Sequence, residues 1–223
     1  MKTLIINLKA YKEAIDYGVA IAQAAKEVSK GSKTRILLAA PYTVLHKLSQ
    51  ITGTLAQHID NIEPGAHTGQ VSWYEVKAAG AVGTLINHSE NKLPLVKIKN
   101  IIDVCRKNGL ESYACASNLA EAKRVAAYKP DCVVYEPPEL IGGNVSVTTA
   151  NPRRVIEFTS YIRGVGLIPL IGAGIKSTHD AKRSVDLGSD GILVSSSVVK
   201  ASNYKASIGA LTAMRSYKNM KVV

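Results

Sequence analysis

The sequence predicts an α/β fold, a closed (β/α)8 barrel that forms a single domain over residues 1–223. Short apolar runs alternate with amphipathic stretches along the chain, which is typical of strands that alternate with helices. Eight such runs occur, so one strand and its crossover take about 28 residues, near the smallest βα unit. An open sheet that binds dinucleotides would carry Gly-x-Gly-x-x-Gly after its first strand, and this chain lacks it. The missing fingerprint favours a closed barrel over an open, doubly wound sheet.

Each predicted strand is a brief aliphatic or β-branched run bounded by Gly, Pro, Asn or Ser, as expected of strands buried on both faces. The predicted strands cover residues 4–7, 35–39, 55–58, 82–86, 112–115, 132–135, 169–171 and 191–194.

Amphipathic periodicity predicts helices over residues 12–29, 93–108, 119–128, 151–163 and 178–187. In the first of these, one face carries Ile15, Val19, Ala22 and Ala25. Asn118 stands where a helix N-cap is expected, and Glu121 follows three residues later. Gly109 and Gly188 stand where two helices should end in a left-handed residue.

Composition limits the classes of partner. The chain carries 28 basic and 17 acidic residues, a net charge of +11 that favours anionic partners. The basic residues form no long block, the densest pairs being Arg153-Arg154 and Lys182-Arg183. We therefore expect a small anionic substrate and no nucleic-acid partner.

Cysteine usage and hydropathy indicate a cytoplasmic protein. Cys105, Cys115 and Cys132 form no Cys-x-x-Cys motif, so we expect buried free thiols in a reducing compartment. The N-terminal apolar run is too short for a signal peptide, and no stretch is long enough to span a membrane. The histidines show no ligand spacing, so we expect no metal.

Polar side chains and amide-rich turns follow five of the predicted strands. In chain order they are Asn7 and Lys9, Asn87-His88-Ser89-Glu90, Glu136, Gly172-Ala173-Gly174 and Ser195-Ser196-Ser197. The carboxyl ends of all strands meet at one mouth of a barrel, where barrel enzymes carry their active sites. We therefore expect these residues to form one site.

The residue types at this mouth suggest chemistry on a phosphorylated substrate. The glycine- and serine-rich turns would present several backbone N–H groups to a phosphate. The same residues also fit two ordinary tight turns that bind no ligand. Glu136 is either a surface ion-pair partner or a general base whose pKa is raised by partial burial. His88, at the start of a helical turn, would stay neutral and donate to a carbonyl oxygen. Lys9 is either an exposed cation or a ligand for substrate charge, and Glu90 could pair with it.

These residues resemble the triosephosphate isomerase family, specifically its short archaeal form. The matching motifs, in chain order, are Asn7-Leu8-Lys9, Gly65-Ala66-His67-Thr68-Gly69, Asn87-His88-Ser89-Glu90, Tyr135-Glu136-Pro137-Pro138-Glu139-Leu140-Ile141-Gly142 and Gly172-Ala173-Gly174-Ile175. The resemblance implies a TIM barrel that interconverts dihydroxyacetone phosphate and D-glyceraldehyde 3-phosphate in glycolysis and gluconeogenesis through a cis-enediolate, without a cofactor.

The resemblance also implies roles for single residues. Glu136 would be the proton acceptor and His88 the electrophile, while Lys9, oriented by Asn7 and held by Glu90, would stabilise negative charge. Besides Asn7 and Lys9, the substrate and its phosphate would be bound by Ile141, Gly142, Gly172, Gly174, Ser195 and Ser196. Residues 137–147 would form a lid over the phosphate.

The third loop, around Thr68, would reach into a neighbouring subunit of a homo-oligomer, a dimer or a tetramer. The chain departs from the family pattern in three places: Gly143-Asn144 in the lid, Ser195-Ser196-Ser197 after strand eight, and Trp73 after the third loop. Trp73 fits either an interface or burial within its own domain.

Two other functions compete with isomerisation. A lyase or aldolase of the same fold would use a Schiff-base lysine, but Lys9 has no cationic neighbour to activate it. A non-catalytic protein that binds a phosphometabolite or nucleic acid would account for the charge, but it would not need Glu136 and His88.

Overall fold

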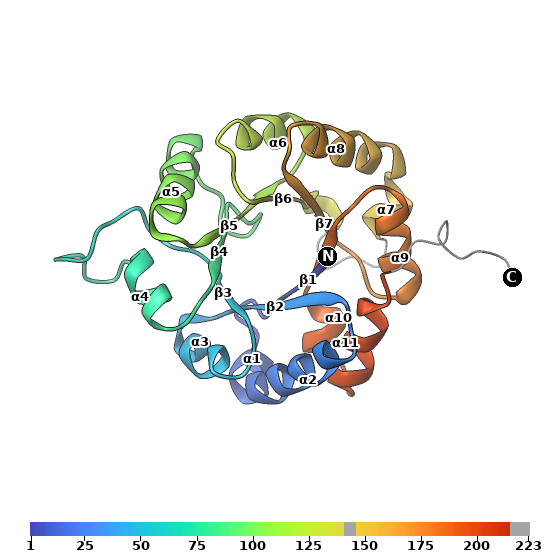
Figure 1. The fold of residues 1–223 in the computed structure, drawn as a ribbon, viewed down its shortest axis with the longest axis horizontal. Coiled ribbons are helices and arrows are strands. Elements are labelled where there is room, and N and C mark those ends of the chain that lie inside the picture. Colours follow the sequence, from blue (N-terminus) through green and yellow to red (C-terminus); the bar gives the residue numbers. More distant parts are fainter. Residues whose placement is uncertain (141–145, 215–223) are drawn as a thin grey trace, which may run out of the picture.

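The computed structural model of the protein describes residues 1–140 and 146–214. Within that part of the chain, eight parallel strands close into a barrel in sequence order, so that β1 pairs with both β2 and β8 (Figure 1). The strands are β1 (Lys2–Asn7), β2 (Thr34–Ala40), β3 (Thr54–Ala56), β4 (Gly83–Ile86), β5 (Glu111–Ala116), β6 (Cys132–Tyr135), β7 (Ile168–Gly172) and β8 (Gly191–Val194). The predicted closed barrel is confirmed.

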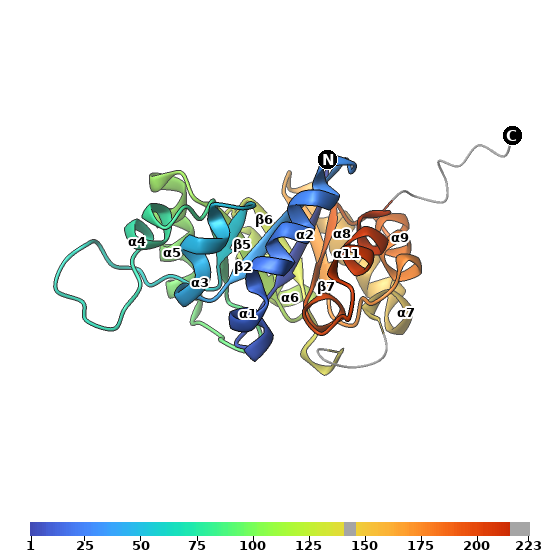
Figure 2. The same ribbon diagram turned by 90° about the horizontal axis from the view of Figure 1, so that it is seen from below.

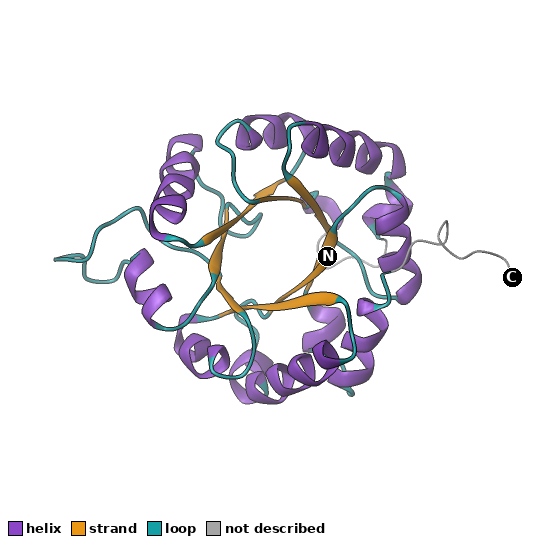
Figure 3. Cartoon of the chain, viewed as in Figure 1, coloured by secondary structure: helices purple, strands orange, loops and turns teal. Residues whose placement is uncertain are grey.

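The helices form an outer ring around the strands, as Figures 1 and 3 show. They are α1 (Lys12–Asp16), α2 (Gly18–Lys30), α3 (Tyr42–Ser49), α4 (Trp73–Ala78), α5 (Leu95–Asn108), α6 (Leu119–Ala126), α7 (Val147–Ala150), α8 (Pro152–Gly164), α9 (Thr178–Asp186), α10 (Ser196–Val199) and α11 (Tyr204–Thr212), with a 3-10 turn, η1, at Pro138–Leu140. In the described part of the chain, none of these helices has the length and apolar character needed to cross a membrane.

The prediction of one helix over residues 12–29 is wrong. The helix breaks at Tyr17, which ends α1 and precedes α2 with a φ of −124°. The break changes which side chains face the barrel, because the two helices no longer share one axis. Ala14 and Ile21 are buried, whereas Ile15, expected on the buried face, is 54% exposed. Helices α3, α4, α7, α10 and α11 lie outside the predicted helical ranges.

The core has two layers, as parallel barrels require. Inside the barrel, Ile5 lies in register with Leu37 of β2 and Leu193 of β8. A larger layer packs between the strands and the helices, where Phe158 of α8 stacks on Tyr135 of β6 with ring centroids 5.2 Å apart. Both layers consist mainly of aliphatic side chains, which matches the low aromatic content. The free thiols of Cys105, Cys115 and Cys132 are all buried, as predicted.

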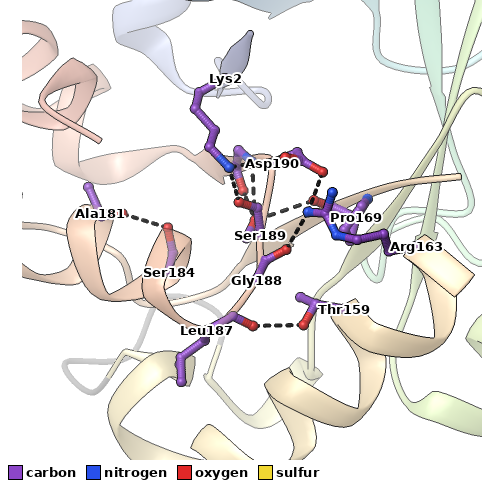
Figure 4. A network of polar contacts seen from close by, with 11 residues as sticks. Lys2, Thr159, Arg163, Pro169, Ala181, Ser184, Leu187, Gly188, Ser189 and Asp190 are labelled. Carbon is purple, nitrogen blue, oxygen red and sulfur yellow. Dashed lines mark hydrogen bonds and ion pairs between the residues drawn. The ribbon is translucent and has the colours of Figure 1, made fainter. Parts of the chain in front are cut away.

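Ionic contacts hold the amino end of the barrel. Asp190, just before β8, accepts from Lys2 Nζ at 3.0 Å and from Arg163 at 2.6 Å, and Arg163 also donates to the Gly188 carbonyl (Figure 4). The contacts join β1, α8 and the turn before β8. They lie at the opposite end of the strands from the residues expected to act on substrate, so their role is stability.

Candidate active site

The carboxyl ends of the strands bring the predicted residues together at one mouth of the barrel. A cleft there is lined by Lys9 after β1, Glu136 after β6, Gly174 after β7, and Ser195 and Ser196 after β8. Its other lining residues are Tyr11, Ala173, Ile175, Lys176, Leu193, Val194 and Ser197. His88 joins this group through its contact with Glu136.

The backbone at Lys9 is held in an unusual conformation. Its φ is +49°, in the left-handed region that non-glycine residues seldom adopt. Two contacts hold it there: the Lys9 N–H donates to Asn7 Oδ1 at 3.0 Å, and Gln57 Nε2 donates to the Lys9 carbonyl at 3.0 Å. Gln57 also lies 3.3 Å from Asn7 Oδ1 and 3.2 Å from the Ala39 carbonyl. Such strain at a site indicates that the ammonium must point in one particular direction.

Sequence reasoning missed Gln57. It follows the last residue of β3 directly, so it stands at the same mouth of the barrel as the residues that were predicted. An amide one residue past a buried strand end was the signal that could have found it.

Lys9 and Glu90 form the expected ion pair. Lys9 Nζ lies 2.5 Å from Glu90 Oε1, and the lysine side chain is only 14% exposed, against 52% for the glutamate. The ammonium therefore lies inside the mouth and the carboxylate at its rim. A charge-assisted contact of this length fixes the lysine side chain as well as its charge.

His88 is buried, and its hydrogen bonds define its tautomer. The Glu90 N–H donates to Nδ1 at 3.2 Å, so we assign the ring hydrogen to Nε2. Nε2 lies 3.4 Å from Glu136 Oε2. Burial lowers the pKa of His88, but the Glu136 carboxylate beside its ring raises it, and the net direction is upward. The backbone N–H on Nδ1 opposes the imidazolium, and a neutral ring during the reaction stays a prediction.

Glu136 is a buried carboxylate with an unused oxygen. The residue is 4% exposed, and among the described residues Oε2 makes no well-formed hydrogen bond, its one close polar neighbour being His88 Nε2 at 3.4 Å. A buried carboxylate oxygen that is incompletely satisfied is costly, which fits a place for a ligand in the cleft. The thiol of Cys115 lies nearby, and its pKa is raised by burial and by Glu136.

Gly172 makes room for Glu136. A Cβ at this position would lie 2.9 Å from both Cγ and Oε1 of the glutamate, closer than real contacts allow. We predicted Gly172 as a substrate-binding residue, and the structure places it against the carboxylate.

The turns after β7 and β8 fit an anion. Ala173 and Gly174 both have positive φ, at +80° and +72°. Ser195 precedes α10, and the buried hydroxyl oxygens of Ser195 and Ser197 have no hydrogen-bond partner among the described residues. Successive backbone N–H groups in such turns form concave anion sites. Of the other predicted phosphate ligands, Ile141 and Gly142 lie outside the described residues, as do Gly143 and Asn144.

Within the described ranges, no three His, Cys, Asp or Glu residues lie close enough together to hold a metal ion. The family model described as triosephosphate isomerase matches residues 2–211. The chain belongs to the triosephosphate isomerase family.

Relatives within the triosephosphate isomerase family match the chain over nearly its whole length. The triosephosphate isomerase of Methanocaldococcus jannaschii is 42% identical over 216 residues, covering 93% of this chain and 97% of that protein. That of Methanoculleus marisnigri is also 42% identical, covering 95% and 97%. A solved triosephosphate isomerase from Bartonella henselae shares the fold, with a TM-score of 0.67 at 19% identity over 87% of this chain and 92% of that one.

The loop between β3 and α4 of this triosephosphate isomerase family member projects away from the barrel (Figures 1 and 2). Its base is clamped: Asp60 and Val71 bond through their backbones, and Asp60 Oδ2 accepts the Val71 N–H at 2.9 Å. Trp73 is partly buried and donates to Glu63 Oε2 at 3.1 Å. The outer part of the loop, including Thr68, is exposed.

Proposed function

We propose that this protein is a triosephosphate isomerase that interconverts dihydroxyacetone phosphate and D-glyceraldehyde 3-phosphate without a cofactor. The observation that carries the proposal is the position of Glu136, which is buried in the cleft with Oε2 3.4 Å from His88 Nε2 and without a well-formed hydrogen bond in the described part of the chain. This carboxylate faces the same space as the Lys9 ammonium and the turns at Gly174 and Ser195. Isomerisation of a phosphorylated hydroxyketone requires a general base, a hydrogen-bond donor, a cation and a phosphate site, and this cleft holds all four.

Glu136 moves the carbon-bound proton. Its carboxylate takes a proton from the carbon that bears the hydroxyl group next to the carbonyl, and the electron pair of the broken C–H bond shifts to the carbonyl oxygen. The product is a cis-enediolate. Glu136 then returns the proton to the neighbouring carbon. The hydroxyl proton moves by way of His88 from its oxygen to the former carbonyl oxygen, and this second transfer completes the exchange of ketone for aldehyde.

His88 and Lys9 stabilise the charge that develops on oxygen. His88 donates its Nε2 hydrogen to the carbonyl oxygen, because Nδ1 already accepts the Glu90 N–H. Once Glu136 has taken a proton, its charge no longer favours the imidazolium. The Lys9 ammonium, fixed by Glu90, adds positive charge that is in place before the reaction begins. Neutral histidine catalysis and lid closure are the known pattern of this family.

The substrate phosphate binds at the turns after β7 and β8, on backbone N–H groups of Gly174, Ser195 and Ser196. One end of the proposed lid is anchored beside this site, since the Val147 N–H donates to the Ala173 carbonyl at 3.2 Å. Closure over the phosphate would exclude water while the enediolate exists.

A Schiff-base mechanism is less consistent with the site. The Lys9 amine would have to be unprotonated to attack a carbonyl, whereas here it is paired with a carboxylate at 2.5 Å.

The subunit assembles as a homo-oligomer, a dimer or a tetramer, in this proposal. The projecting third loop leaves Thr68 with no cover from its own barrel, and Tyr17, Tyr42 and Tyr74 are exposed on neighbouring elements. Large exposed aromatic side chains are typical of interfaces. In a dimer, Thr68 would approach Lys9 of the neighbouring subunit. The free cysteines support a cytoplasmic location.

A coupled assay that measures conversion of glyceraldehyde 3-phosphate to dihydroxyacetone phosphate tests the proposed activity. Wild-type protein should turn over rapidly, and Glu136→Gln should lose at least about a thousandfold in kcat, because the amide cannot accept the proton. A folded but inactive wild-type protein would overturn the proposal. Asp103→Asn, on the exposed side of α5, is the matched control and should keep wild-type activity.

A further inference from the structure

Asn87, the residue between β4 and His88, is held by three hydrogen bonds. Its φ of +60° lies in the left-handed region, and the residue is 2% exposed. Nδ2 donates to the Cys115 carbonyl and to Glu121 Oε1, both at 2.9 Å. Oδ1 accepts the Leu93 N–H at 2.9 Å. A strained conformation persists only where its surroundings determine it, and here the side chain supplies that constraint.

The carboxylate that accepts the Asn87 hydrogen bond is that of Glu121, which belongs to the next βα unit. Glu121 lies in the first turn of α6, where its N–H donates to the Asn118 side chain that caps the helix. Its Oε2 accepts the Ser117 N–H at 2.7 Å, while Oε1 accepts from both Asn87 and Lys92. Burial acts to raise the pKa of Glu121, but Lys92, the Ser117 N–H and Asn87 lower it on balance. The carboxylate stays charged, with every oxygen partnered.

Glu121 therefore binds the His88 loop at two points, before the histidine and after it. Asn87 precedes the histidine, and Lys92 follows it by four residues, yet both donate to the same oxygen. Neither Glu121 nor Lys92 lines the cleft where the proton transfers take place. We propose that Glu121 is a positioning residue for the isomerisation, which holds His88 at its working distance from Glu136 by binding Asn87 and Lys92 together. The inference rests on the proposed function.

Glu121→Gln tests this role with little change in volume. The glutamine has one acceptor oxygen and one NH2 group, so the NH2 group must face either the Ser117 N–H or the Asn87 and Lys92 donors. Facing Asn87 and Lys92, the NH2 group would remove both contacts to the His88 loop, and facing the Ser117 N–H it would remove the contact that anchors the side chain on its own loop. Either loss should let His88 shift. Displacements of about 1 Å can reduce catalysis by about a hundredfold. We expect kcat to fall at least tenfold with KM within twofold, because the phosphate turns after β7 and β8 are not touched.

A spectroscopic signal separates positioning from general stability. The 15N shifts of the His88 ring report the Nδ1 contact with the Glu90 N–H, and these shifts should move in Glu121→Gln. Asp103→Asn is the matched control, since it removes a carboxylate from two exposed pairs on neighbouring α5. It should leave both kcat and the His88 shifts at their wild-type values.

Lys92→Met provides a second variant if Glu121→Gln does not fold. The lysine side chain is 40% exposed, so its loss should be tolerated, and it should lower kcat in the same direction by a smaller factor. Wild-type kcat and unchanged His88 shifts in whichever of the two folds would overturn the inference. An inactive wild-type protein would instead overturn the proposed function, and the His88 shifts would still report whether Glu121 positions the ring.

Discussion

Glu136 Oε2 and His88 Nε2 lie 3.4 Å apart, although their residues follow strands β6 and β4, which are not neighbours in the barrel. Both side chains are nearly fully buried, and both point into the mouth between their strands. The pair therefore places a proton acceptor and a hydrogen-bond donor side by side at the barrel mouth. This contact ties the protonation of each group to that of the other.

The charge of Glu136 controls the pKa of His88. Burial lowers that pKa and Glu136 raises it on balance, so Glu136→Gln should lower the pKa of His88, with burial and Lys9 then opposed only by Glu90. Titration of the histidine ring signals by NMR measures this change, with exposed His46 as the reference in the same spectra. An identical His88 titration in both proteins would contradict the coupling.

The same contact gives stability a pH dependence. Because the folded-state pKa of His88 is raised, the stabilisation from this pair is complete below about pH 6.5 and is lost as pH rises through the folded-state pKa. The free energies of unfolding of wild-type protein and Glu136→Gln should be measured with denaturant below pH 6.5 and above the folded-state pKa of His88. The difference between the two proteins should be smaller at the higher pH. A constant difference would argue against the linkage.

Gly172→Ala should impair catalysis without unfolding the protein. The added Cβ would lie 2.9 Å from Cγ and Oε1 of Glu136, so the carboxylate must move while the strand stays in place. We expect kcat to fall by about a hundredfold, with a smaller change in KM. Gly164→Ala is the control, because nothing lies within 4 Å of a Cβ at that position. Wild-type kcat in Gly172→Ala would show that the position of Glu136 is not critical.

Asp190→Ala should reduce stability and leave kcat unchanged. It removes the acceptor for Lys2 and Arg163 at the amino end of the barrel (Figure 4). We expect the free energy of unfolding to fall by about 1–2 kcal/mol, since the contacts are partly exposed. Glu27→Ala breaks a more exposed pair with Lys205 and should cost less. A large loss of kcat in Asp190→Ala would contradict the division of the barrel into a stabilising and a reactive end.

Thr68→Arg should break the proposed assembly. The loop tip is exposed in the single subunit, so an arginine there is harmless to its own fold but places a charge inside a neighbour. Light scattering coupled to gel filtration should show a smaller species than wild type, with reduced activity. Gln23→Arg, on the exposed side of α2, should leave the mass unchanged. A wild-type mass for Thr68→Arg at low micromolar concentration would contradict the predicted interface.

Strand ends were the part of the site that could be predicted. Lys9, His88 and Glu136 each follow a short apolar run, and a closed barrel brings all such positions to one mouth. The same signal could have placed Gln57 at the mouth, but its role could not be assigned, because that role is a set of contacts to Asn7 and Lys9 after another strand. Such pairings depend on barrel geometry, which a linear pattern does not contain.

Local breaks were predicted least well. The periodicity of residues 12–29 runs through Tyr17, but the chain turns there, and Ile15 faces solvent. The structure adds a contact to Gly172, whose role in binding substrate stays a prediction: a Cβ there would meet Glu136. This contact joins two strands, so neighbouring residues in the sequence carry no trace of it.

The most direct test of the account is deuterium transfer from solvent, measured by NMR of the products in D2O. If Glu136 carries the proton between adjacent carbons, wild-type enzyme should convert the substrate, and any deuterium that enters by exchange at the Glu136 carboxyl group should appear only at the carbon that Glu136 reprotonates. Glu136→Gln should show neither turnover nor incorporation while keeping the wild-type circular dichroism spectrum. Turnover or deuterium incorporation by Glu136→Gln within tenfold of wild type would contradict the account.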